Sequence, residues 1–110
     1  VQQLTTLMQQ GVTVIDIRTP EEWKQTGIVK GSHAIMFFDK NGKPYIEEWL
    51  QQSQHLINPD EAVILICRSG NRTTKVGNFL SKQMGFKKVY SVKGGIKSWQ
   101  KAGYETQASR

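Results

Sequence analysis

Short apolar stretches alternate along the chain with amphipathic ones. Residues 12–17 (VTVIDI) and 62–66 (AVILI) are apolar and rich in β-branched side chains, which favours buried β-strands. Residues 32–36 and 88–92 predict two further strands. Because helical patterns separate these segments, we expect an α/β fold with a mostly parallel sheet and helices on both faces.

The segments between the predicted strands have the spacing of helices that pack on a sheet. After Thr73, apolar side chains recur at Val76, Phe79, Leu80 and Met84, which forms one stripe of a helix. Other helices are expected at residues 3–10, 20–26, 45–54 and 96–102.

The helix expected after residue 19 begins with a strong local signal. Thr19 stands at the N-cap position, Pro20 at the first helical position and Glu22 two residues later, which together form a capping box. Gly27 is expected to end this helix. The capping box accounts for Glu22 better than a role as a catalytic base.

Length and composition predict one soluble domain that spans residues 1–110. The apolar runs have the length of strands, so we expect no membrane span. The net charge is +6, but the lysines are spread along the chain and do not interleave with aromatic side chains. This argues against nucleic acid and favours small anions or an acidic partner protein. The chain begins at Val1 without a signal-peptide pattern, which leaves cytoplasm and periplasm both open.

Metal and disulfide chemistry are not expected. A single cysteine excludes a disulfide within the chain and a zinc site built on several cysteines. His33 and His55 lack the spacing of metal ligands, both to each other and to Cys67. We therefore predict no metal and no cofactor.

The cysteine, Cys67, begins a short polar loop between a predicted strand and a predicted helix. Residues 67–73 (CRSGNRT) follow the apolar run 62–66 directly. A loop in this place directs backbone N–H groups and a helix N-terminus toward the thiol, and both favour an anion. Arg68 and Arg72 add positive charge on either side. The sequence therefore predicts a reactive thiolate at the carboxyl end of a parallel strand, where sites in such sheets lie.

Three blocks of the sequence carry a family resemblance. Residues 67–72 (CRSGNR) resemble the active-site loop of single-domain rhodaneses, which are sulfurtransferases. Residues 15–23 (IDIRTPEEW) and 92–99 (VKGGIKSW) are similar to that family's amino-terminal and carboxyl-terminal signatures. One segment departs from the pattern: residues 27–32 are GIVKGS where the family often has GHIPGA.

The resemblance implies transfer of a sulfane sulfur. Cys67 would take sulfur from a small anionic donor such as thiosulfate, hold it as a persulfide, and pass it to a thiol or cyanide. Asp16 and Arg18 are expected to be structural neighbours of the site, because buried polar groups at strand ends usually tie loops together. The loop residues expected to bind substrate are Arg68, Ser69, Gly70, Asn71, Arg72 and Thr73.

Two other functions remain open. The chain could be a persulfide carrier that serves an acidic partner protein. It could also be a phosphatase of the Cdc25 type or an arsenate reductase, which use a similar loop. Those phosphatases have one more residue between cysteine and arginine, whereas here four residues separate Cys67 from Arg72 and residue 73 is threonine. The shorter loop forms a smaller cradle, which favours a single sulfur atom.

Overall fold

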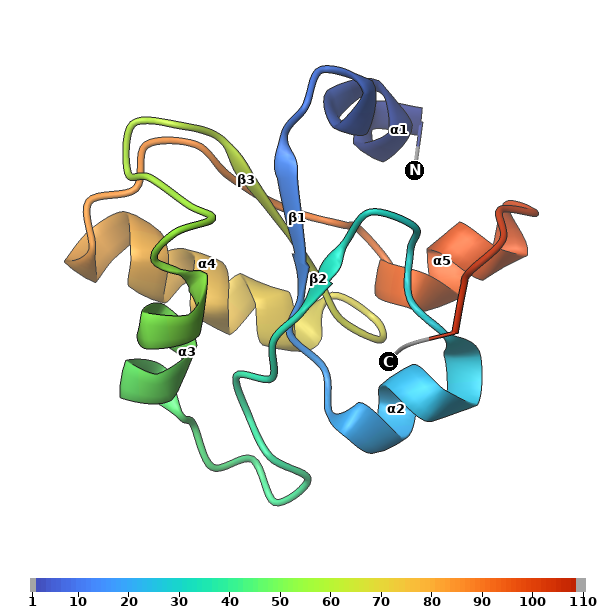
Figure 1. Ribbon diagram of the computed structural model, residues 1–110, viewed down its shortest axis with the longest axis horizontal. Coiled ribbons are helices and arrows are strands. Elements are labelled where there is room, and N and C mark those ends of the chain that lie inside the picture. The colour runs from blue at the N-terminus through green and yellow to red at the C-terminus, as the bar shows by residue number, and fades with distance from the viewer. Residues whose placement is uncertain (1, 109–110) are drawn as a thin grey trace.

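The computed structural model describes residues 2–108, which fold around one parallel sheet (Figure 1). The order of the strands across the sheet is β2-β1-β3-β4, and each neighbouring pair is parallel. The predicted α/β class is therefore confirmed. The strands are β1 (Thr13–Asp16), β2 (His33–Ala34), β3 (Val63–Ile66) and β4 (Val89–Ser91).

Helices cover both faces of the sheet, as predicted. Figure 1 shows α3 and α4 on one side and α1 and α5 on the other, with α2 beside α5. Their bounds are α1 (Gln2–Gln9), α2 (Pro20–Thr26), α3 (Ile46–Ser53), α4 (Asn71–Gln83) and α5 (Gly95–Lys101).

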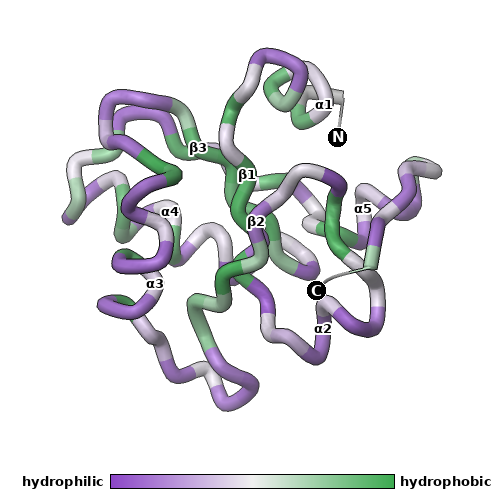
Figure 2. Tube along the Cα trace, in the orientation of Figure 1, coloured by the Kyte–Doolittle hydropathy of each residue, from purple (hydrophilic) through white to green (hydrophobic). Residues whose placement is uncertain are grey.

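The two faces of the sheet are packed into separate apolar layers because successive strand residues point in opposite directions. Ile15 and Leu65 contact the layer that includes Trp49 of α3 and Leu80 of α4. The alternate strand residues, such as Ile64, face the other layer, under α1 and α5. Figure 2 shows this pattern as hydrophobic colour on the central strands and hydrophilic colour on the outer turns. The predicted buried strands therefore form the core.

The predicted capping box at the start of α2 is present. The Thr19 side chain accepts from the Glu22 backbone, the Glu22 side chain accepts from the Thr19 backbone, and Pro20 begins the helix. Gly27 ends α2 with a φ of 75°.

Helix α4 begins two residues before the predicted start, at Asn71. Its N-cap is Gly70, which has a φ of 100° and offers no side chain for capping. A left-handed N-cap of this kind gives no signal in the apolar pattern, so that pattern predicts a helix start that is two residues too late. Thr73 therefore lies inside the helix, and it is fully buried.

The segment in which this chain departs from the GHIPGA pattern is held by other contacts. Ile28 and Val29 are buried, and Ile28 exchanges two backbone hydrogen bonds of 2.8 Å with Gln107. Ser32 donates to the Val29 carbonyl at 2.6 Å.

Within residues 2–108, no helix has both the length and the apolar character needed to cross a membrane.

Candidate active site

Cys67 lies directly after β3, at the carboxyl edge of the sheet, and its side chain is buried with 1% exposure. The backbone N–H of Gly70 donates to the Cys67 Sγ at 3.1 Å. The thiol itself donates to the Thr73 hydroxyl across 3.7 Å. The loop therefore turns back on the sulfur, and the positive φ of Gly70 permits this turn without strain.

The first turn of helix α5 donates hydrogen bonds to the backbone of the same loop. The Ile96 N–H donates to the Cys67 carbonyl at 2.7 Å, and the Lys97 N–H donates to the Arg68 carbonyl at 3.2 Å. A Cβ on Gly95 would lie 2.3 Å from the Cys67 carbonyl oxygen, so this close approach requires glycine. The block of residues 92–99 thus contacts the cysteine loop, although the two are distant in sequence.

Asp16 and Arg18 form a buried ion pair beside the site, with 0% and 1% side-chain exposure. The Asp16 carboxylate accepts from the Arg18 Nε and Nη2, and from the Trp23 indole at 3.1 Å. The guanidinium also donates to the Thr26 hydroxyl at 2.7 Å and to the Gly27 carbonyl at 2.8 Å. These contacts tie the end of β1 to the middle and the C-terminal end of α2, which supports the structural role expected for the pair.

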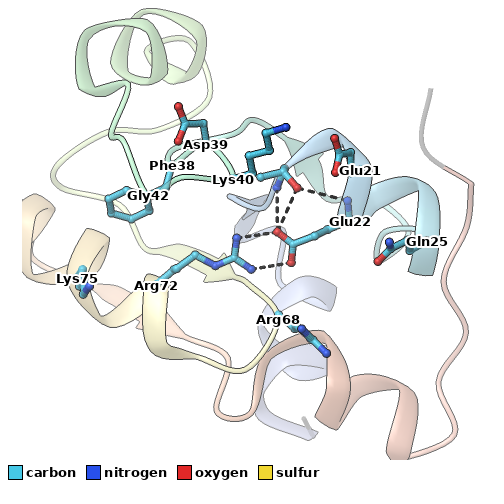
Figure 3. Close-up of a pocket in the computed structure, with 11 residues that line it drawn as sticks. Glu21, Glu22, Gln25, Phe38, Asp39, Lys40, Gly42, Arg68, Arg72 and Lys75 are labelled. Atoms are coloured by element: carbon cyan, nitrogen blue, oxygen red, sulfur yellow. Dashed lines mark hydrogen bonds and ion pairs between the residues drawn. The ribbon is translucent and has the colours of Figure 1, made fainter.

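Arg72 has a partner that the sequence did not indicate. Its Nη1 and Nη2 donate to the Oε1 and Oε2 of Glu22, each at 2.7 Å (Figure 3). The two residues are 50 positions apart, and the capping box already accounted for Glu22. Glu22 therefore serves both as a helix cap and as an ion-pair partner.

This ion pair shifts the titration of both groups. Partial burial acts to raise the pKa of Glu22, but the hydrogen bonds and charge of Arg72, with hydrogen bonds from Thr19, outweigh it and lower the pKa. The hydrogen bond to Glu22 raises the pKa of Arg72 against the effect of burial, and the charges of Glu22, Cys67 and Asp16 add to the rise. Both groups of the pair are therefore ionised at neutral pH.

A pocket of about 430 Å³ lies beside this pair. It is formed by α2, the loop of residues 38–42, the cysteine loop and the first turns of α4 (Figure 3). A second pocket of about 280 Å³ lies between α2 and α5. Cys67 lines neither pocket. The residues that line the first pocket are Thr19, Glu21, Glu22, Gln25, Phe38, Asp39, Lys40, Gly42, Arg68, Arg72 and Lys75.

The predicted substrate-binding residues fall into three groups. Gly70 and Thr73 contact the sulfur, whereas Arg68 and Arg72 line the larger pocket. The side chains of Ser69 and Asn71 are exposed and line neither pocket. In residues 2–108, no three His, Cys, Asp or Glu side chains gather in a way that could hold a metal ion.

Replacing Thr73 by valine is expected to lower the free energy of unfolding by about 1 kcal/mol. The buried hydroxyl donates to the Gly70 carbonyl at 3.0 Å, forms a short hydrogen bond with Ser91 and accepts from the Cys67 thiol, and valine keeps the shape but loses all three contacts. Thr74→Val is the matched control, because the exposed Thr74 hydroxyl donates to the same carbonyl at 3.0 Å. Urea unfolding of the two variants measures the difference. An equal loss of unfolding free energy in both variants would show that the buried Thr73 hydroxyl contributes no more to stability than the exposed Thr74 hydroxyl.

The family model of the rhodanese-like domain matches residues 1–102 of the chain. Thiosulfate sulfurtransferase 18 of Arabidopsis thaliana is 32% identical over 103 residues, which cover 90% of this chain and 74% of that protein. Thiosulfate sulfurtransferase GlpE of Actinobacillus pleuropneumoniae serotype 3 is 29% identical, over 83% of this chain and 91% of its own length. The crystal structure of a rhodanese-related protein from Thermoplasma volcanium is 32% identical, with a TM-score of 0.63 over 86% of this chain and 82% of that one. Because the family match spans nearly the whole sequence, the chain belongs to the rhodanese-like domain family.

Proposed function

We propose that this protein is a sulfurtransferase that moves a sulfane sulfur from an anionic donor such as thiosulfate to a thiophilic acceptor. The observation that carries the proposal is the position of the Cys67 sulfur, which lies at the end of a parallel strand and accepts the Gly70 N–H at 3.1 Å. The relatives from Arabidopsis thaliana and Actinobacillus pleuropneumoniae, both thiosulfate sulfurtransferases, support the same reaction.

The first half of the reaction loads Cys67. The Cys67 thiolate attacks the sulfane sulfur of thiosulfate, and a new S–S bond forms at Sγ. The S–S bond of thiosulfate breaks, and sulfite leaves with the bonding electron pair. The Gly70 N–H and the N-terminus of α4 stabilise negative charge at the sulfur, while Arg68 and Arg72 attract the anion.

The second half of the reaction unloads Cys67. Cyanide or a thiolate attacks the outer sulfur of the persulfide and forms a bond to it. The bond between this sulfur and Sγ breaks, and its electron pair returns to Sγ as the thiolate. No external oxidant or reductant is consumed, and no cofactor takes part.

A persulfide carrier that serves an acidic partner protein is the second candidate. The observation that favours it is a group of cations around the larger pocket. Among residues 2–108, no ion pair joins Lys40, Arg68 or Lys75 to a carboxylate. Capture of an acidic partner that weakens steeply with added salt, together with poor turnover of thiosulfate, would favour the carrier.

Incubation with thiosulfate is expected to add about 32 Da to the protein, the mass of one sulfur atom, as measured by intact-mass spectrometry. Subsequent cyanide should remove the added mass and release thiocyanate. Because the chain has a single cysteine, an adduct on a thiol reports on Cys67 alone. If the protein takes up no sulfur from any sulfane donor, including thiosulfate and an alkanethiosulfonate anion, the proposed sulfur transfer is rejected.

A further inference from the structure

The carboxylate of Glu22 occupies the side of Arg72 on which an incoming anion would bind. Resting on the proposed function, we propose that Glu22 is a specificity-determining residue that competes with the anionic sulfur donor for Arg72. A donor must displace this carboxylate before its oxygens can bind the same pair of N–H groups on Nη1 and Nη2. Glu22 therefore sets the affinity of the site for anions.

The geometry of the pair is that of a bound oxyanion. Each carboxylate oxygen of Glu22 accepts from a separate nitrogen of Arg72 at 2.7 Å. This two-pronged arrangement is how a guanidinium binds the forked oxygens of an anionic ligand. In Figure 3 the two groups face each other at the wall of the pocket, whereas Arg68 points away from them. The position that suits a donor oxyanion on Arg72 is thus filled by a side chain of the protein.

The pair is exposed enough to exchange with a ligand. The side chains of Arg72 and Glu22 are 27% and 22% exposed, unlike the fully buried pair of Asp16 and Arg18. Ion pairs that water reaches contribute little to stability, so a competing anion can replace one partner. Glu22 also lines both pockets, which places it where a ligand enters from either side.

Glu22 has a second set of partners that would hold it after displacement. Its Oε1 accepts from the Thr19 backbone N–H at 3.3 Å and from the Thr19 hydroxyl at 3.2 Å. These capping contacts are independent of Arg72, so release of the guanidinium does not leave the carboxylate without hydrogen bonds. The Glu22 carboxylate would therefore keep its contacts with Thr19 when the Arg72 guanidinium turns to an anion.

The other carboxylates of the pocket are not in a position to compete. Asp39 accepts the backbone N–H groups of Asn41 and Lys43, each at 2.9 Å, and the Tyr45 hydroxyl at 3.0 Å. Glu21 lines the pocket, but in the part of the chain that the structure describes it forms no ion pair. Glu21 therefore offers a matched control for the loss of one negative charge at the same helix end.

The test compares Glu22→Gln with Glu21→Gln by alkylating Cys67 with two reagents of similar size. Iodoacetate is an anion and iodoacetamide is neutral, and glutamine at position 22 keeps the capping function. In Glu22→Gln the ratio of the iodoacetate rate to the iodoacetamide rate is expected to rise about three- to fivefold over wild type, the range expected for loss of an exposed charge pair. In Glu21→Gln the ratio should rise far less. The Michaelis constant for thiosulfate should fall in Glu22→Gln by a similar factor, with kcat changed less.

Two results would overturn the inference. An equal rise with both reagents in Glu22→Gln would mean that the side chain only obstructs access. Equal ratios in the two variants would mean that any negative charge at this helix end has the same effect. Alkylation requires no sulfur transfer, so a raised ratio in a protein that takes up no sulfur would reject the proposed function and keep the anion competition. Sulfur uptake with an unchanged ratio would keep the proposed function and reject the anion competition.

Discussion

Replacement of Cys67 by serine is expected to abolish sulfur uptake and turnover while the protein stays folded. Serine has nearly the same shape, and its hydroxyl oxygen still accepts the Gly70 N–H that now binds Sγ at 3.1 Å. A hydroxyl does not ionise as a thiol does, however, and an alkoxide is not available as the nucleophile at neutral pH. Intact-mass spectrometry after exposure to thiosulfate, together with the rate of thiocyanate formation, measures the loss.

A chemical control blocks the thiol without a mutation, and so tests whether the sulfur atom itself is required. Wild-type protein that iodoacetamide has alkylated at its one cysteine should fail to take up sulfur in the same way. Urea unfolding of Cys67→Ser confirms that the fold survives. Sulfur uptake by the serine variant, at any appreciable fraction of the wild-type level, would exclude Cys67 as the carrier.

Replacement of Asp16 by alanine is expected to lower the free energy of unfolding by about 3–5 kcal/mol. The variant leaves the Arg18 guanidinium at 1% exposure with no carboxylate to balance its charge. The Trp23 indole also loses its acceptor. A large part of the stability of a small domain would therefore be lost, and the midpoint of urea unfolding measures the change.

Asp60→Ala provides the matched comparison, because Asp60 also forms an ion pair at 2.9 Å, but with Lys87 at the surface. These two side chains are 75% and 71% exposed, so the expected loss is no more than about 1 kcal/mol. The double variant Asp16→Ala/Arg18→Met should be more stable than Asp16→Ala alone, since it removes the unbalanced charge. Equal losses for Asp16→Ala and Asp60→Ala would contradict a buried ion pair beside the site.

The parts of the fold that were predicted correctly depend on local patterns. The apolar run of residues 62–66 contains β3, and the capping box at Thr19 and Glu22 marks the start of α2. Each signal lies within a few residues of the structure that it specifies, so a single sequence reveals it. The same holds for the position of Cys67 after β3, because a strand followed by a loop and a helix fixes that position.

Strand β2 shows the limit of local patterns at the edge of the sheet. The sequence predicts a strand over residues 32–36, but the regular strand is His33–Ala34. The pairing with β1 nevertheless continues in part, since the Ile35 N–H donates to the Asp16 carbonyl and the Phe37 N–H to the Ile17 carbonyl. The apolar pattern therefore marked the segment that packs on the sheet, whereas hydrogen bonding to one neighbour alone decided where the regular strand ends.

The contacts that complete the site could not be predicted, because they join residues far apart in the chain. The sequence predicts that Arg72 binds substrate, but it gives no sign of the ion pair with Glu22, which is 50 residues away on another helix. The packing of Gly95 against the Cys67 carbonyl is of the same kind. Pairs such as these become visible only when the backbone brings the loops together at one edge of the sheet.

The burial of the single thiol would determine how long the protein keeps a sulfur atom bound to Cys67. A persulfide on Cys67 has no second cysteine in this chain to resolve it into an internal disulfide. Two such molecules would also react poorly with each other, because Cys67 is only 1% exposed. Under the proposed function, the lifetime of a persulfide on Cys67 would therefore depend on which acceptors can reach this buried thiol.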